Sequence, residues 1–215
     1  GQVLADGHAA TKAGHRFDSR VNLEVKTGPR FVSRGGEKLE AALNAFHLNV
    51  DGVVCLDVGA STGGFTDCLL QHGARRVFAV DVGKGQLHWK VRQNPRVVVL
   101  DEVNARYLKK DDVPEPPAFA SVDVSFISLT KVLPAVIQVL EDSADLVTLI
   151  KPQFEAGRDK VGKGGVIRDP AVRQAVVEKI RQWGTDSGGL KWIGVSESPI
   201  RGPAGNVEFL ACWKK

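Results

Sequence analysis

Three aspartates at the ends of strand-like segments have the spacing of a nucleoside-binding site. Asp57, Asp81 and Asp101 each fall at the carboxyl end of one of three successive predicted strands, and ligands of open α/β sheets bind at that edge. Asp81, 24 residues beyond Asp57, can accept both hydroxyls of an adenosine ribose, and Asp101 is placed to face an adenine amino group. Each acid taken singly is equally compatible with a solvated strand end. Together they predict an adenosyl-binding site.

A glycine-rich turn joins the first of these strands to a predicted helix. Its sequence is Leu56-Asp57-Val58-Gly59-Ala60-Ser61-Thr62-Gly63-Gly64-Phe65. Gly59 permits a tight turn, and Gly63 and Gly64 would let a ligand approach the backbone at the helix N-terminus. Asp57 is placed to bind a ligand ammonium group, directly or through water. The segment lacks the Gly-Lys-Ser/Thr of a P-loop, and Ser61 replaces the second glycine of a dinucleotide fingerprint. A turn without a ligand is therefore the alternative interpretation.

Two further polar residues, Asp123 and Lys151, directly follow apolar strand-like segments. Both are therefore expected at the same rim of the sheet as the aspartates. Lysines usually stay at the surface with only their stems covered, but Lys151 stands between an apolar run and a proline, which favours the rim. Spacing alone supports no role for Lys38, which reads as a charge on a helix surface. Nor does it support one for Glu208, which reads as the solvent side of an edge strand.

The segment 157–168 is rich in glycine and basic residues, and we expect a mobile loop there. Its cationic side chains are Arg158, Lys160, Lys163 and Arg168. A flexible basic loop beside the rim of the sheet suits contacts to phosphates. An ordinary solvated surface loop explains the composition equally well.

The order of elements that must position these residues indicates an α/β fold. Strands are predicted at Val53–Asp57, Arg76–Asp81, Arg96–Leu100, Phe119–Asp123, Ala144–Ile150, Leu190–Ser196 and Asn206–Trp213. Helices are predicted at Arg34–Phe46, from the glycine-rich turn to Gln71, at Leu129–Leu140, and at Pro170–Trp183 with Asp169 as its cap. This alternation predicts right-handed crossovers and a doubly wound, mostly parallel sheet. The last two strands have no helix between them, so an antiparallel hairpin should end the sheet. A Rossmann-like seven-stranded sheet of this kind is typical of class I methyltransferases.

Composition sets the limits within which the fold must work. The 215 residues suffice for one sizeable core, and the net charge of +4 with a pI near 9.0 tilts toward a polyanionic partner. No apolar run approaches the roughly 20 residues of a membrane span, and no secretory signal is recognisable. The three cysteines form no metal or disulfide pattern, as expected of a cytoplasmic protein. Met is absent even at position 1, so we expect the natural chain to start earlier.

Residues 1–27 lack the alternation of strand-like and helical segments that the rest of the chain shows. Two short strand-like stretches, residues 1–8 and 21–25, flank a basic loop at Lys12–Arg20. This piece is too small to bury a core of its own, so we expect a remnant of another domain, a linker at 28–32 and a main domain at 33–215.

Five segments together form a specific pattern. They are Ser33-Arg-Gly-Gly-Glu-Lys-Leu, Asp57-Val-Gly-Ala-Ser-Thr-Gly-Gly-Phe-Thr-Asp, Asp123-Val-Ser-Phe-Ile-Ser-Leu, Lys151-Pro-Gln-Phe-Glu and Gly205-Asn-Val-Glu-Phe. The chain from about Ser33 resembles the TlyA family of bacterial proteins, which includes haemolysin-like proteins and FtsJ-related ribosomal RNA 2′-O-methyltransferases. The resemblance implies S-adenosylmethionine as cofactor and ribosomal RNA or a ribosomal subunit as partner. It implies 2′-O-methylation, with cytidine as the expected nucleotide, and it makes residues 1–27 the tail of an S4-type RNA-binding domain.

The resemblance also implies roles for individual residues. A Lys-Asp-Lys-Glu catalytic tetrad falls on Lys38, Asp123, Lys151 and Glu208, with Lys151 as the base, Lys38 as a neighbouring cation and the acids as orienting groups. The residues expected at the cofactor are Asp57, Gly59, Ala60, Ser61, Gly63, Gly64, Phe65, Asp81, Asp101 and Asp123. The residues expected at the RNA are Arg34, Arg158, Lys160, Lys163 and Arg168. No metal ligand is expected.

Three other classes of protein compete with this interpretation. A dehydrogenase would need a nicotinamide pocket and a hydride-handling residue, and the sequence shows neither. An RNA-binding module without catalysis would use the basic charge and the S4-like segment equally well, and binding of S-adenosylmethionine is the observation that separates the two. A haemolysin-type protein would need a membrane-inserting segment, and the sequence offers no long apolar or strongly amphipathic stretch. The modified nucleotide, the ribosomal subunit and the oligomeric state lie beyond the sequence.

Overall fold

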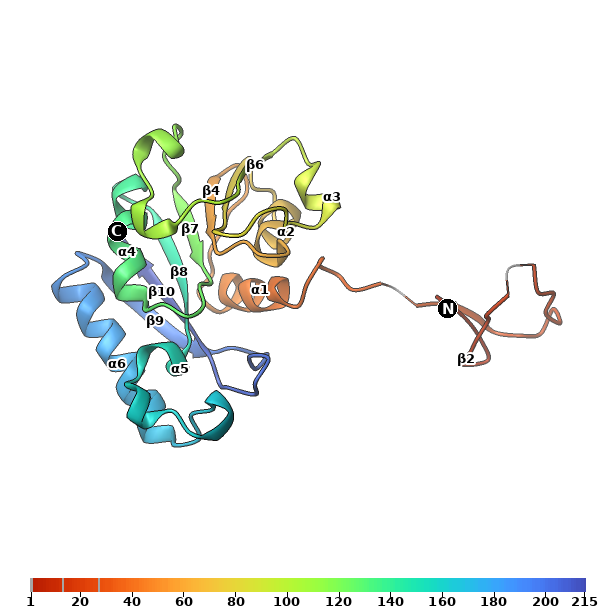
Figure 1. Cartoon of the computed structure of the whole chain (residues 1–215). Helices are drawn as coiled ribbons and strands as arrows, with labels where there is room; N and C mark the ends of the chain where they lie inside the picture. The colour runs from red at the N-terminus through yellow and green to blue at the C-terminus, as the bar shows by residue number, and fades with distance from the viewer. Residues whose placement is uncertain (1, 13, 27) are drawn as a thin grey trace. The chain divides into compact units, whose positions relative to one another are not determined.

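The computed structural model describes residues 2–12, 14–26 and 28–215 of the chain. It divides into two compact units, Gly1–Arg30 and Phe31–Lys215 (Figure 1). The division falls inside the segment 28–32 that the sequence suggests as a linker.

The first unit contains a three-stranded antiparallel sheet in the order β2-β1-β3. Its strands are β1 (Val3–Ala5), β2 (His8–Ala9) and β3 (Leu23–Val25). No residue of these strands is fully buried. Gly1, at the start of the predicted segment 1–8, lies outside the described residues.

The second unit is built on a seven-stranded sheet in the order β6-β5-β4-β7-β8-β10-β9. Its strands are β4 (Val54–Val58), β5 (Arg76–Val80), β6 (Val97–Leu100), β7 (Phe119–Val122), β8 (Asp145–Ile150), β9 (Lys191–Glu197) and β10 (Phe209–Lys214). The pairs from β6 to β8 are parallel, and β10 is antiparallel to both β8 and β9. The predicted fold class and the terminal hairpin are confirmed.

The two strands of the hairpin enter the sheet in reverse order, because β10 lies next to β8 and β9 lies at the edge. Leu210, Ala211 and Cys212 of β10 are fully buried, as a central strand requires. In β9 exposed residues alternate with half-buried ones, which is the pattern of an edge strand with one face toward solvent. The chain therefore passes β8, places β9 at the edge and returns between them.

Helices cover both faces of this sheet (Figure 1). They are α1 (Gly35–Ala45), α2 (Gly64–Gln71), α3 (Trp89–Arg92), α4 (Leu129–Val139), α5 (Pro152–Glu155) and α6 (Pro170–Asp186). Leu39 of α1 and Leu69 of α2 belong to one buried cluster, and Leu133 of α4 and Ile180 of α6 belong to the other. Two apolar layers on opposite faces explain why the strands read as continuous apolar runs.

The structure corrects the sequence-based element bounds in several places. The last long helix continues to Asp186 rather than ending at Trp183, and the short helices α3 and α5 were not predicted. The segment 157–168 is not featureless, because it contains the single 3-10 turns Arg158–Lys160 and Lys163–Gly165. No helix in the described parts of the chain is long and apolar enough to cross a membrane.

Candidate active site

A cavity of about 550 Å³ opens at the carboxyl ends of β4, β5 and β7. This volume falls within the range of small-molecule sites. Its polar wall includes Ser61, Asp81, Asn104, Asp123 and Ser125. Its apolar wall includes Val80, Val82, Val103, Ala105 and Ile127. Apolar walls with a few convergent polar groups suit an adenosyl group, whose base is flat and whose ribose presents two hydroxyls.

The glycine-rich turn bounds this cavity, and its glycines serve different purposes. Gly59 has a φ of +82°, and a Cβ atom there would lie 2.3 Å from the carbonyl oxygen of Asp123, so only glycine fits. A Cβ atom at Gly64 would lie 2.2 Å from Ser33 Oγ and 2.9 Å from Gly36 N. The start of α1, rather than a ligand, therefore occupies the space that the absent side chain of Gly64 leaves. Ala60, Gly63 and Phe65 also do not line the cavity.

Asp57 lies beneath the turn and is completely buried. Its two carboxylate oxygens accept hydrogen bonds from Thr66 Oγ1 at 2.6 Å and from Ser121 Oγ at 3.2 Å. Burial raises the pKa of this carboxyl to about 7, although both hydroxyl groups oppose the shift. The carboxylate is thus not among the residues of the cavity wall, and its role in binding an ammonium group, directly or through water, stays a prediction.

Asp81 and Asp101 have different environments, although both follow parallel strands. Asp81 lines the cavity, and its carboxylate accepts hydrogen bonds from Ser61 N at 2.8 Å and Gly83 N at 2.7 Å. These bonds hold it at the edge of the turn. Asp101 does not line the cavity and instead pairs with Arg92 at 2.8 Å, which holds the pKa of Asp101 below its usual range. Asn104, three residues further along the chain, is on the cavity wall.

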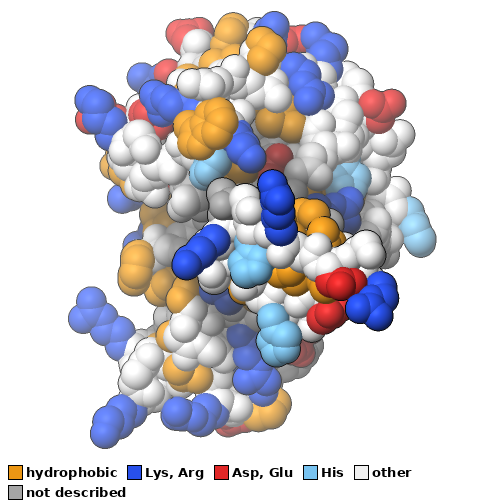
Figure 2. All heavy atoms as spheres, turned by 90° about the vertical axis from the view of Figure 1, so that its right-hand side faces the viewer, with side chains coloured by type: hydrophobic (Ala, Val, Ile, Leu, Met, Phe, Trp, Pro, Cys, Tyr) orange, Lys and Arg blue, Asp and Glu red, His pale blue; other side chains and the backbone are white. Residues whose placement is uncertain are grey.

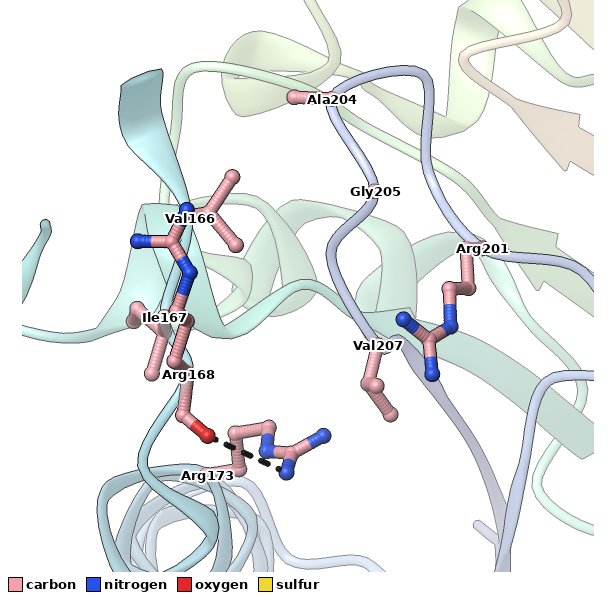
Figure 3. Close-up of a pocket in the computed structure, with 8 residues that line it drawn as sticks. All are labelled: Val166, Ile167, Arg168, Arg173, Arg201, Ala204, Gly205 and Val207. Atoms are coloured by element: carbon pink, nitrogen blue, oxygen red, sulfur yellow. Dashed lines mark hydrogen bonds between the residues drawn. The ribbon is translucent and has the colours of Figure 1, made fainter. Parts of the chain in front are cut away.

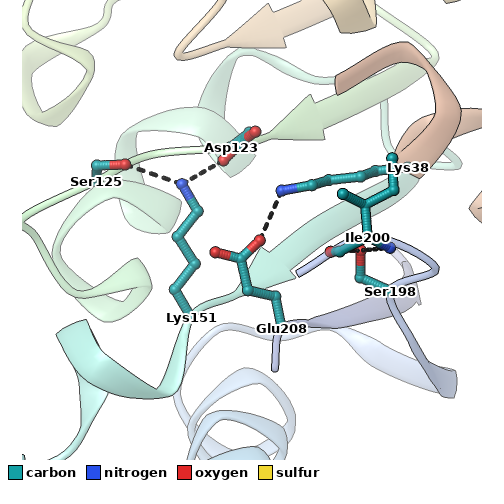
Figure 4. A network of polar contacts seen from close by, with 7 residues as sticks. All are labelled: Lys38, Asp123, Ser125, Lys151, Ser198, Ile200 and Glu208. Carbon is teal, nitrogen blue, oxygen red and sulfur yellow. Dashed lines mark hydrogen bonds and ion pairs between the residues drawn. The ribbon is translucent and has the colours of Figure 1, made fainter. Parts of the chain in front are cut away.

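The four residues of the predicted tetrad form two lysine–carboxylate pairs (Figure 4). Lys38 Nζ lies 2.6 Å from Glu208 Oε2, and Lys151 Nζ lies 2.5 Å from Asp123 Oδ1. Lys151 also donates a hydrogen bond to Ser125 Oγ at 2.9 Å. The exposed fraction of both lysines is below a tenth. Each lysine therefore has a carboxylate as its ionic partner, so the charge of Lys38, predicted to act as a neighbouring cation for Lys151, is itself paired.

Sheet topology explains why residues so far apart in the chain meet here. Asp123 and Lys151 follow the parallel strands β7 and β8, so both lie at the same rim. Because β10 is antiparallel, it is its beginning that lies at this rim, where Phe209 pairs with Ile150. Glu208 immediately precedes Phe209 and so comes beside Lys151. Lys38 reaches the group from the buried side of α1.

Asp123 and Ser125 connect the two halves of the site, because both line the cavity and both contact Lys151. Asp123 Oδ1 is buried and accepts no well-aligned hydrogen bond within the described chain. Its ionic partner is Lys151 Nζ. Ser125 was missed by the sequence reasoning, although it stands only two residues after Asp123 in a segment that the reasoning had singled out.

The basic residues predicted at the RNA are all exposed, as a phosphate-binding role requires. Arg34 precedes α1, and Arg158, Lys160 and Lys163 lie on the 3-10 turns of the 157–168 segment. Figure 2 shows Lys and Arg side chains spread over the visible face rather than gathered in one patch. Arg168 lines a cavity that Arg173 and Arg201 also line.

The fold and this site define a class I, S-adenosylmethionine-dependent methyltransferase. The chain belongs to the FtsJ-like methyltransferase family, whose pattern matches residues 31–215. The 16S/23S rRNA (cytidine-2′-O)-methyltransferase TlyA of Mycobacterium tuberculosis is 46% identical over 215 residues, which cover 97% of this chain and 78% of that protein. Hemolysin A of Brachyspira hyodysenteriae is 45% identical over 212 residues, covering 98% of this chain and 88% of that protein.

Solved structures agree with this assignment. The crystal structure of a candidate hemolysin from Lactococcus lactis superposes with a TM-score of 0.84 at 52% identity, covering 86% of this chain and 89% of that one. An N-methyltransferase from Bradyrhizobium japonicum in complex with S-adenosylhomocysteine has a TM-score of 0.58 at 15% identity, covering 85% of each chain, and shares the fold alone. The resemblance inferred from the sequence motifs is confirmed.

Proposed function

We propose that this chain transfers a methyl group from S-adenosylmethionine to the 2′-hydroxyl of a cytidine in ribosomal RNA. The observation that carries the proposal is the placement of the Lys151–Asp123 pair at the edge of the cavity between β4, β5 and β7. A relative that is 46% identical is named for this reaction. The identity spans the segments that contain all four residues of the site.

The residues of the cavity fit an adenosyl ligand. Asp81 would accept the ribose hydroxyls, because its carboxylate lies on the wall and its orientation is held by two backbone amides. The apolar side chains of Val82, Val103 and Ala105 would enclose the adenine ring. The bound cofactor supplies an electrophilic methyl group on a sulfonium. The task left to the protein is to hold a hydroxyl in line with that methyl group and to remove its proton.

We assign to Lys151 the role of the base that removes the proton of the ribose hydroxyl. A ribose hydroxyl is a weak nucleophile, and the Lys151 amine, once its own proton has passed to solvent, can accept the hydroxyl proton as the oxygen attacks. Asp123 then stabilises the resulting ammonium, and Ser125 keeps Nζ directed at the rim. The Lys38–Glu208 pair lies next to this group and would orient the ribose through the carboxylate and ammonium atoms not already committed to each other.

The first unit and the basic segments complete the proposal. Residues 1–27 would belong to an S4-type RNA-binding domain, and the exposed residues of the 157–168 segment would contact RNA phosphates. The protein would act on ribosomal subunits and therefore in the cytoplasm.

The test is methylation of ribosomal subunits. Purified small and large subunits, isolated from cells that lack the gene, would be incubated with the protein and labelled S-adenosylmethionine, and the digested RNA would be analysed for 2′-O-methylcytidine by mass spectrometry. Incorporation into a cytidine by the natural sequence, and none by Lys151→Ala, is the expected result. A protein that binds the cofactor by calorimetry yet methylates neither subunit would contradict the proposed substrate.

A further inference from the structure

A second cavity, of about 470 Å³, lies beside the site and contains three arginines. Arg168 precedes α6, Arg173 lies in its first turn, and Arg201 lies in the segment between β9 and β10. Figure 3 shows Arg173 and Arg201 approaching from opposite sides, with the side chain of Val207 between their guanidinium groups. The cavity thus combines an apolar floor with cationic side chains on its walls, and the Arg168 guanidinium lies beside Val166 rather than between the other two (Figure 3).

The charges of this cavity are not neutralised within the described chain. None of the residues that line it is acidic, and none of the three arginines forms an ion pair with a described carboxylate. Arg173 Nε is buried without a hydrogen-bond partner, while one terminal nitrogen of its guanidinium donates to the carbonyl oxygen of Arg168 at 3.4 Å.

The wall of this cavity is bound to the segment that carries Glu208. Asn206 Oδ1 accepts a hydrogen bond from Ile167 N at 3.0 Å, and Asn206 Nδ2 donates to the carbonyl oxygen of Gly165 at 2.8 Å. Val207, on the floor, is the neighbour of Glu208 in the chain. A ligand held by the arginines would therefore lie next to the Lys38–Glu208 pair.

We propose that the cavity formed by Arg168, Arg173 and Arg201 binds a backbone phosphate of the RNA close to the methylated nucleotide. This inference rests on the proposed function, because it assigns the contact to the RNA substrate. Guanidinium groups present paired N–H donors that match the oxygens of a phosphodiester, and such charge-assisted bonds are stronger than neutral ones. Anchoring one phosphate beside Glu208 would fix the position of the neighbouring ribose at the rim.

The experiment compares Arg201→Ala and Arg173→Lys with the control Arg181→Ala. Arg201 is exposed, so its truncation opens no core cavity, and Arg181 is an exposed arginine of α6 that pairs with Glu178 instead. Binding of an RNA fragment containing the methylated cytidine would be measured by fluorescence anisotropy at several salt concentrations. Arg201→Ala should weaken binding about tenfold and reduce the slope against log salt by about one. Arg173→Lys, which keeps the charge without the paired donors, should weaken it less, and Arg181→Ala should bind like the natural sequence.

Two further measurements separate this inference from the proposed function. Cofactor affinity, measured by calorimetry, should be the same in all variants, and methylation by Arg201→Ala should show a raised KM with little change in kcat. If the natural sequence methylates RNA while Arg201→Ala and Arg173→Lys keep its RNA affinity, salt slope and KM, the phosphate site is wrong and the proposed function stands. Thermal unfolding would also be measured in inorganic phosphate at millimolar concentration. If phosphate protects the natural sequence but not Arg201→Ala, while Arg201→Ala keeps the RNA affinity of the natural sequence, the cavity binds a free anion and the RNA assignment is overturned. If no RNA is methylated at all, it is the proposed function that fails.

Discussion

The ammonium group of Lys38 lies 2.6 Å from the carboxylate of Glu208, and 170 residues of chain separate the two. Only 1% of the Glu208 side chain and 10% of the Lys38 side chain are exposed. A buried pair of this kind is weak evidence for stability, because desolvation of both charges offsets their attraction. Its position beside Lys151 (Figure 4) fits the orienting role that we propose for it.

Removing one member of this pair should destabilise the fold, whereas removing both should not. Lys38→Met leaves a buried carboxylate without its partner and should lower the free energy of unfolding by about 3 kcal/mol. The double change Lys38→Met with Glu208→Leu replaces both charges by apolar side chains and should recover most of that loss while methyl transfer stays absent. Urea unfolding of the single and double variants, with a methylation assay on each, checks both expectations. A double variant that is stable and fully active would show that the pair has no part in the reaction.

Lys151→Ala should abolish methyl transfer and leave cofactor binding nearly intact. Lys151 follows the end of β8, so its truncation leaves no cavity in the sheet, and the Asp123 side chain, 22% exposed, can gain solvation. Lys151→Arg should fail almost as completely, because a guanidinium keeps its charge but does not release its proton at working pH. Single-turnover kinetics with saturating cofactor measure the loss. Substantial turnover by Lys151→Arg would mean that Lys151 only holds the RNA or stabilises charge, and that another group takes the proton.

Asp81→Asn should weaken the binding of S-adenosylmethionine at least tenfold, because an amide cannot accept from both ribose hydroxyls. Asp101→Asn is the matched control. It is also an aspartate after a parallel strand, but it pairs with Arg92 away from the cavity and should change the affinity less than about threefold, well within 1 kcal/mol. Isothermal titration calorimetry of both variants gives the comparison. Equal losses in the two would place Asp101 at the cofactor as the sequence alone suggested.

Asp57 should make the stability of the protein fall between about pH 4 and pH 7. Its pKa rises from the ordinary value of about 4 to about 7 in the folded protein. Below pH 4 both the folded and unfolded states hold the proton, and between the two values only the folded state does. The free energy of unfolding therefore decreases as pH rises through this window and levels off above it. The decrease in the free energy of unfolding is on the order of 2–4 kcal/mol, because each pKa unit corresponds to about 1.4 kcal/mol.

Asp57→Asn tests this pH dependence, because its amide is neutral at every pH. Relative to the natural sequence, the variant should gain stability as the pH is raised from 4 to 7.5. Thr66 and Ser121 are hydroxyl groups that can rotate to serve an amide, so the variant should fold. Urea unfolding at four pH values measures the difference. A difference that does not change with pH would show that Asp57 ionises normally.

The sequence alone determined the sheet and the residues at the ends of its parallel strands. Alternating apolar and helical segments allow few topologies, because right-handed crossovers place consecutive strands in parallel. Asp123 and Lys151 were therefore predictable as neighbours, since the carboxyl ends of β7 and β8 lie at one rim. The requirement for glycine at Gly59 was equally visible, because a strand that turns sharply into a helix leaves no space for a Cβ atom.

The tertiary structure alone decided which side chains complete the site. Glu208 lies at the rim because β10 enters the sheet antiparallel between β8 and β9, and neither its neighbours nor its spacing predicts that insertion. Lys38 reaches Glu208 because α1 packs closely on α2, where the absent side chain of Gly64 makes room for Ser33. Asp101 turns from the cavity to Arg92 for a reason of the same kind. Local patterns define an element and its ends, whereas the direction of a side chain depends on the partner that packing places beside it.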